Sequence, residues 1–136
     1  MSQALFRIVV ALSGAIVLLL ALNIVMGGVA TAGWRGERPF FAVTDDEQFR
    51  LIDSHTRFLG GLFAATGLVL LLGALDPRKY AQALNVVFIG IFLGGLARFA
   101  KPDMEAFMTS DVGTALAAEL ILMPVLAFWL SRLRRG

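Results

Sequence analysis

The chain has no cysteine, a single histidine and few charged residues for its length. Charged residues make up 16% of the 136 residues, whereas a soluble domain has about 25%. The absence of cysteine excludes disulfides, thiolate metal sites and cysteine nucleophiles. One histidine cannot form a histidine metal site, and no Walker, nucleophile-elbow or metalloprotease pattern occurs. We therefore expect no enzyme, no catalytic residues, no metal and no cofactor.

A basic surface suited to nucleic acid is also lacking. The formal net charge is only +2, and the basic residues are not interleaved with aromatic residues along one stretch. We therefore expect no nucleic-acid partner. Membrane lipid is a sufficient partner for arginines that lie at the edges of apolar segments.

Hydrophobic residues are abundant, at 58% of the chain, and they gather in four stretches that contain one charged residue, Glu119. Each stretch is about long enough for a transmembrane helix, which needs roughly 17–25 apolar residues. The sequence predicts an all-α polytopic membrane protein, a four-transmembrane-helix bundle forming one membrane domain over residues 1–136. The expected spans are about 8–30, 58–75, 80–97 and 112–131, with outer loops at 34–57 and 98–111.

The N-terminal stretch also resembles a secretory signal peptide, because Arg7 precedes an apolar run that ends in Ala30-Thr31-Ala32. The apolar run exceeds the usual length of about 7–15 residues, so we favour a retained first span.

Four spans place six basic residues on each side of the membrane. Those on the side of the termini lie in very short segments, which favours a cytoplasmic location for both termini. We expect a multi-pass protein of the cell inner (plasma) membrane.

The outer loops contain signals for helix starts. Thr44 and Glu47 match a capping box in which the threonine caps the helix, and Ser110 or Asp111 is suited to cap the fourth span. A short interfacial helix is expected around Met104–Met108.

The first outer loop also contains charges at helical spacing. The pairs Asp46–Arg50 and Asp53–Arg57 are spaced i, i+4. We favour a salt-bridged, solvated extension of the second helix. In the alternative, Arg50, Asp53 and Arg57 form a polar stripe that faces a cavity.

The peptide Phe-Leu-Gly-Gly-Leu occurs at 58–62 and again at 92–96. In an antiparallel hairpin the two copies would lie at the same outer depth. Glycine pairs allow close approach of membrane helices, so we interpret Gly60, Gly61, Gly94 and Gly95 as helix-packing residues.

Glu119 is the only ionisable residue well inside a span. It follows Asp111 by eight residues, which corresponds to a depth of about 12 Å. Such a residue is costly in a membrane unless it is paired, protonated or hydrated. Arg98 is the favoured partner and Arg57 the second choice. A structural ion pair is favoured, with proton titration or ligand anchoring as the alternatives, and Pro124 is expected to kink the helix nearby.

These residues resemble a known family. The pattern consists of an acid-rich segment, then Phe49-Arg50, Arg57-Phe58, Gly60-Gly61, Gly94-Gly95-Leu96-Ala97-Arg98, Glu119 and Pro124. It resembles the small bacterial four-helix membrane family known as domain of unknown function family 4345. The resemblance implies the four-helix fold and implies that Arg50, Arg98 and Glu119 occupy the polar positions of the family. It supplies no activity, substrate or cofactor.

The function expected from the sequence is non-enzymatic. A ligand-binding or accessory bundle would hold a polar pocket at its outer-leaflet end, built from Arg50, Arg57, Arg98 and Glu119. Its partner would be a lipid, a quinone or another hydrophobic or amphipathic small molecule, or the bundle would act as a homo-oligomer or an accessory subunit of a membrane complex. The alternative is a proton-coupled small-molecule transporter, oligomeric, with Glu119 as the titrating group.

Overall fold

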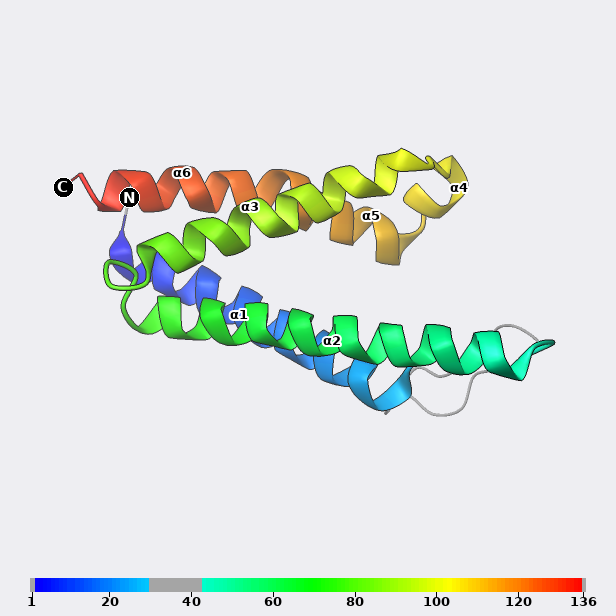
Figure 1. Cartoon of the computed structure of the whole chain (residues 1–136). Helices are drawn as coiled ribbons and strands as arrows, with labels where there is room; N and C mark the ends of the chain where they lie inside the picture. The colour runs from blue at the N-terminus through cyan, green and yellow to red at the C-terminus, as the bar shows by residue number, and fades with distance from the viewer. Residues whose placement is uncertain (1, 30–42, 136) are drawn as a thin grey trace. The chain divides into compact units, whose positions relative to one another are not determined.

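The computed structural model describes residues 2–29 and 43–135, and all regular secondary structure in these ranges is helical (Figure 1). The residues 30–32 of the signal-like motif and the start of the first outer loop lie outside the described residues. The chain divides into two compact units. We call Leu12–Leu71 the hairpin unit, and Met1–Ala11 together with Leu72–Gly136 the terminal unit.

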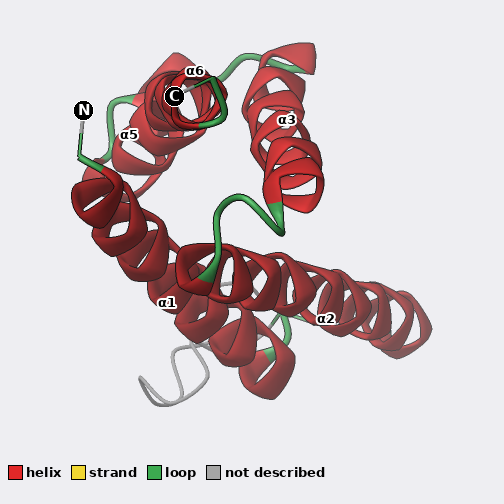
Figure 2. Ribbon diagram, turned by 90° about the vertical axis from the view of Figure 1, so that its left-hand side faces the viewer, coloured by secondary structure: helices red, strands yellow, loops and turns green. Residues whose placement is uncertain are grey.

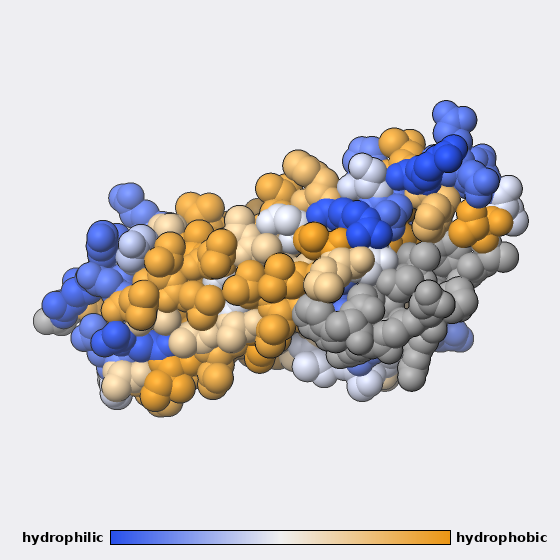
Figure 3. Space-filling model, turned by 90° about the horizontal axis from the view of Figure 1, so that it is seen from below, coloured by the Kyte–Doolittle hydropathy of each residue, from blue (hydrophilic) through white to orange (hydrophobic). Residues whose placement is uncertain are grey.

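Among the described residues, four helical segments are long and apolar enough to cross a membrane, namely Gln3–Gly27, Asp46–Leu75, Ala81–Ala100 and Ser110–Leu133. Large apolar side chains remain exposed along each of them. On the face shown in Figure 3, hydrophobic side chains cover the middle of the helices and hydrophilic side chains gather toward their ends. The predicted all-α membrane fold with four spans is therefore confirmed.

The hairpin unit consists of α1 (Gln3–Gly27) from Leu12 onward and α2 (Asp46–Leu75) up to Leu71. The two helices lie side by side (Figures 1 and 2). A Cβ atom built on Gly67 would lie 2.9 Å from the backbone nitrogen of Leu18, and one on Gly14 would lie 3.0 Å from the Cβ atom of Leu70. Small residues therefore bring the two backbones together, as is typical of membrane helices.

The start of α2 corrects one prediction from the sequence. The carboxylate of Asp45 accepts hydrogen bonds from the backbone N–H groups of Glu47 and Gln48, both at 3.0 Å. Asp45 is thus the N-cap, and the prediction that Thr44 caps the helix was wrong. The helix begins one residue later than a Thr44 cap requires, so the Asp45 side chain reaches the free amides of the first turn.

The terminal unit begins with the first residues of α1 and continues from the end of α2 through a polar turn. In this turn the Asp76 carboxylate accepts a hydrogen bond from the backbone N–H of Lys79 at 3.0 Å. The elements that follow are α3 (Ala81–Ala97), the 3₁₀ turn η2 (Arg98–Ala100), α4 (Met104–Phe107), α5 (Ser110–Ala117), the π-helical turn η3 (Ala118–Leu122) and α6 (Met123–Leu133).

The core of this unit forms where α3 packs against α6 and η3. Leu84 and Phe88 of α3 and Leu126 and Leu130 of α6 are buried there. This packing holds η3 beside the end of α3, which positions the site described below.

Two caps define the connection between α3 and α5. Asp103 accepts a hydrogen bond from the Ala106 amide at 3.0 Å and so starts the short helix α4. Thr109 Oγ1 accepts from the Val112 amide at 3.3 Å. The predicted short helix is present, whereas the prediction of Ser110 or Asp111 as the cap of the fourth span was wrong. Thr109 has the extended backbone that an N-cap requires, and Ser110 is already helical.

Candidate intramembrane ion-pair site

Arg98 and Glu119 form an ion pair within the terminal unit. Arg98 Nε donates to Glu119 Oε2 and Arg98 Nη2 donates to Glu119 Oε1, each at 2.8 Å. Two parallel hydrogen bonds of this kind fix both position and orientation of the two groups. The Arg98 side chain is 40% exposed and the Glu119 side chain 18%. The partner that the sequence favoured for Glu119 is therefore the one present.

Gly95 makes this pairing sterically feasible. A Cβ atom at Gly95 would lie 2.8 Å from the Glu119 Cβ atom and 2.8 Å from Leu120 Cδ2. Any larger residue would push η3 away from α3. The glycine therefore sets the distance across which the guanidinium of Arg98 reaches the carboxylate.

The same contact places Glu119 near the end of the third span. Gly95 lies beside Glu119 and precedes the end of the third span, Ala100, by five residues. Five residues of helix correspond to about 8 Å. Glu119 therefore lies beside the last turns of the third span, about 8 Å along the helix from its end.

A π-helical turn presents Glu119 to this position. The backbone N–H of Met123 donates to the carbonyl of Ala118, five residues earlier. Pro124 explains the irregularity, because proline has no N–H and its ring crowds the carbonyl of Leu120. The extra residue in the turn rotates the preceding segment relative to α6. Turns of this kind are frequent at functional sites.

The Asp53–Arg57 pair belongs to the hairpin unit, and its contacts differ from those of the Arg98–Glu119 pair. Arg57 Nε donates to Asp53 Oδ2 at 2.7 Å. Arg57 Nη1 donates to the carbonyls of Val25 at 2.6 Å and Met26 at 3.0 Å, and the Val29 amide donates to Asp53 Oδ1 at 2.9 Å. The Arg57 guanidinium thus donates hydrogen bonds to carbonyls at the C-terminal end of α1, which is the negative end of the helix dipole. The pair is thus a cap for α1 rather than only a solvated bridge on α2.

Gly28 completes that cap. Its φ of +62° is the left-handed conformation that glycine adopts readily at a helix end. Sequence reasoning did not connect Asp53 and Arg57 with α1. The available signal was the Gly27-Gly28 pair at the end of an apolar run, which is typical of a helix C-terminus.

The remaining candidates make fewer contacts. Arg50 is exposed, and the expected ion pair between Asp46 and Arg50 is absent from the described part of α2. Within its own unit Gly60 approaches Ile24 and Val25 of α1.

The other two glycines of the repeated pairs, Gly61 and Gly94, have open space where a Cβ atom would lie, among the described residues of their own units. Their packing role stays a prediction. Across the described ranges, no three His, Cys, Asp or Glu side chains gather closely enough to hold a metal ion.

Comparison with known proteins identifies the family. Residues 5–130 match the family described as Domain of unknown function (DUF4345). No curated protein and no solved structure matches the chain.

Proposed function

Since the chain belongs to the DUF4345 family, whose description gives no activity, we propose a function from its own contacts: a non-enzymatic membrane protein that binds the polar head of an amphipathic molecule at Arg98. The observation that carries the proposal is the half-exposed Arg98 guanidinium, held by Glu119 at the end of an apolar span.

The chemistry of Arg98 supports this assignment. A guanidinium has five N–H donors, and Glu119 accepts two hydrogen bonds. The Arg98 side chain makes no other hydrogen bond within the described chain. Donors left unpaired near hydrocarbon are costly, and a lipid phosphate or a quinone carbonyl would accept from them.

The surroundings suit the tail of such a molecule. Leu93, Leu96 and Phe99 flank Arg98 along the chain and are exposed large apolar residues. Glu119 acts as the orienting group, because it fixes the plane of the guanidinium. With both termini in the cytoplasm, the site would lie in the outer leaflet of the inner membrane. A homo-oligomer or an accessory role in a larger complex is compatible with the same site.

The test measures which amphiphiles remain bound. The full chain is purified in mild detergent, and retained small molecules are identified by mass spectrometry after denaturation. Arg98→Gln should lower the retained amount about tenfold or more, which is the effect of losing charge-assisted hydrogen bonds of about 1.5–3 kcal/mol. Lys101→Gln is the matched control, since Lys101 is exposed and its replacement removes the same charge. Equal retention in Arg98→Gln, or none in the native chain, would rule the proposal out.

Proton-coupled transport is the second candidate, and the π-turn around Glu119 next to Pro124 favours it. An irregular backbone within a span allows local rearrangement, and Glu119 would take up a proton on release from Arg98. Reconstituted protein should then show a pH-dependent flux that Glu119→Gln abolishes while the helical content is retained. A flux that persists in Glu119→Gln would exclude this role for the residue.

A further inference from the structure

The other end of the terminal unit concentrates positive charge. It is the end where α1 begins, α2 turns into α3 and α6 terminates (Figure 1). The basic residues there are Arg7, Arg78, Lys79, Arg132, Arg134 and Arg135. The one acidic residue, Asp76, accepts from the backbone of Lys79, and none of the six cations forms an ion pair within residues 2–29 and 43–135.

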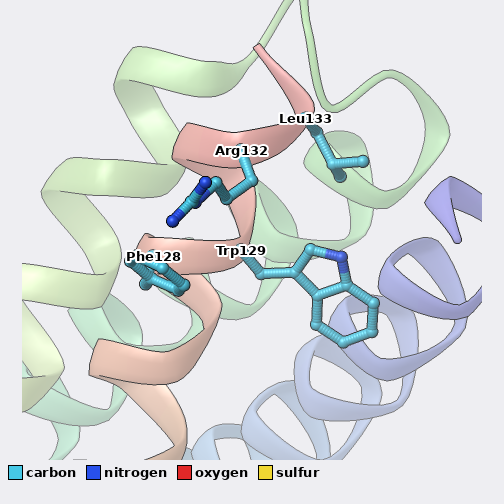
Figure 4. A pocket seen from close by; sticks show the side chains of 4 residues that line it. All are labelled: Phe128, Trp129, Arg132 and Leu133. Carbon is cyan, nitrogen blue, oxygen red and sulfur yellow. The ribbon is translucent and has the colours of Figure 1, made fainter. Parts of the chain in front are cut away.

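A groove of about 400 Å³ lies at this end, lined by Phe128, Trp129, Arg132 and Leu133 of α6. The guanidinium carbon of Arg132 lies 5.0 Å from the centroid of the Phe128 ring. Figure 4 shows Arg132 over Phe128, with the Trp129 indole extending to the other side. The aromatic ring holds the guanidinium by a cation–π contact, and the guanidinium N–H groups make no hydrogen bond to the described residues.

The Trp129 wall of the groove is rigid. Its ring packs edge-on against Phe6, with centroids 5.5 Å apart and planes at 73°. Trp129 is only 7% exposed, and its indole N–H has no acceptor among the described side chains and backbone. This N–H is itself buried, so Trp129 contributes to the groove through its ring and not through a hydrogen bond to a ligand.

We propose that this groove is a binding site for an anionic phospholipid, with Arg132 as the phosphate-binding residue. The planar guanidinium matches the oxygens of a phosphate. The volume suits a head group, and Phe128 and Leu133 provide an apolar surface for the first part of an acyl chain. The other basic residues at this end of the unit, which form no ion pair within the described residues, attract anionic lipid to it.

This site is independent of the proposed ligand site at Arg98. The two lie at opposite ends of α6 and η3 and share no residue. A general positive field would attract anionic lipid equally through every arginine at this end. If the groove itself binds the lipid, binding depends more on Arg132 than on Arg134. Arg132 lines the groove, whereas Arg134 lies two residues later and does not line it.

The experiment uses Trp129 as its own reporter. The chain has two tryptophans, so Trp34→Phe leaves Trp129 as the only one. The full chain is placed in phosphatidylcholine nanodiscs that contain a minor fraction of either brominated phosphatidylglycerol or brominated phosphatidylcholine, and bromine quenching of Trp129 is compared. The measurement is made at about 1 M salt, where the Debye length is about 3 Å and the general field is screened.

Brominated phosphatidylglycerol should quench the fluorescence of Trp129 more strongly than brominated phosphatidylcholine does at the same fraction. Arg132→Gln should lower this preference about tenfold, the loss expected for charge-assisted hydrogen bonds, while Arg134→Gln should leave it within about twofold. Arg132→Lys and Arg134→Lys repeat the comparison with the charge retained, in case Arg132→Gln does not fold. No preference in the native groove, or equal losses at the two positions, overturns the proposal.

Discussion

At the scale of single residues, the Arg98–Glu119 pair stabilises the terminal unit only as a pair. Removing either partner leaves a charge near hydrocarbon, whereas removing both leaves an apolar contact. We expect Arg98→Met and Glu119→Leu each to lower the free energy of unfolding by about 1–2 kcal/mol, an estimate reduced for the partial exposure of both groups. The double variant should regain about 1 kcal/mol of the summed loss. Thermal unfolding in detergent, followed by circular dichroism, measures the cycle. Strictly additive losses would show that the two residues do not stabilise one another.

This pair was predictable, because one ionisable residue within a span has few partners and long side chains from the same membrane side are the natural choice. The caps were less predictable. Thr44 and Asp45 are adjacent and both are good N-cap residues, as are Thr109 and Ser110. The choice between neighbours depends on where packing starts the helix, which local sequence does not encode.

A second residue-scale prediction concerns Gly28. Alanine there would adopt a left-handed conformation that costs about 1–2 kcal/mol, and its Cβ would collide with the Asp53 carboxylate. Gly28→Ala should therefore lower the unfolding temperature in detergent and disrupt the cap on α1. Gly61→Ala, which meets open space in the hairpin unit, is the control. A Gly28→Ala variant as stable as Gly61→Ala would contradict the assigned cap.

At the scale of helices, the two members of each repeated Gly-Gly pair differ within their own unit. A Cβ atom at Gly60 or Gly95 would meet a neighbouring element, whereas one at Gly61 or Gly94 would meet open space there. Adjacent residues on an α-helix point about 100° apart, so only one member of a pair can face a given neighbouring helix. The sequence predicted that glycines pack here. It could not say which of the two does so, because the rotation of each helix is set by its tertiary contacts.

This division predicts opposite effects for matched substitutions. Gly95→Ala would place a methyl group 2.8 Å from Glu119 and Leu120 and should destabilise by about 1–3 kcal/mol through overpacking. Gly94→Ala meets no atom of the terminal unit and should be neutral or stabilise by up to about 1 kcal/mol, because alanine favours helix. Unfolding in detergent distinguishes them, and equal effects would refute the described packing of α3.

The hairpin unit offers the same comparison. A Cβ at Gly60 would lie 2.9 Å from Ile24 and 3.1 Å from Val25, so Gly60→Ala separates α1 from α2 while Gly61→Ala does not.

The π-turn is another element-scale feature that sequence alone located only in part. Pro124 indicates a disturbance, but a proline is compatible with either a kink or a π-turn, so the sequence does not distinguish the two.

At the scale of the whole molecule, the hydropathy pattern was sufficient to predict four spans, because each helix must satisfy its own backbone in a membrane and needs an apolar surface of fixed length. Charge, in contrast, orients the spans only by a balance of basic residues. Four spans require both termini and the Asp76–Lys79 turn to share one side, and α4 and the start of α2 to share the other.

The absence of native cysteine makes this arrangement directly testable by single-cysteine labelling in intact cells. Gln48→Cys and Glu105→Cys lie at exposed positions beyond the apolar spans and should react with a membrane-impermeant maleimide from outside. Ser2→Cys and Arg135→Cys should react only after the membrane is permeabilised, since the dense basic residues near the termini favour the cytoplasm. The reverse pattern would invert the orientation and retain the four-span fold. Reaction of Ser2→Cys and Arg135→Cys from different sides would exclude an even number of spans.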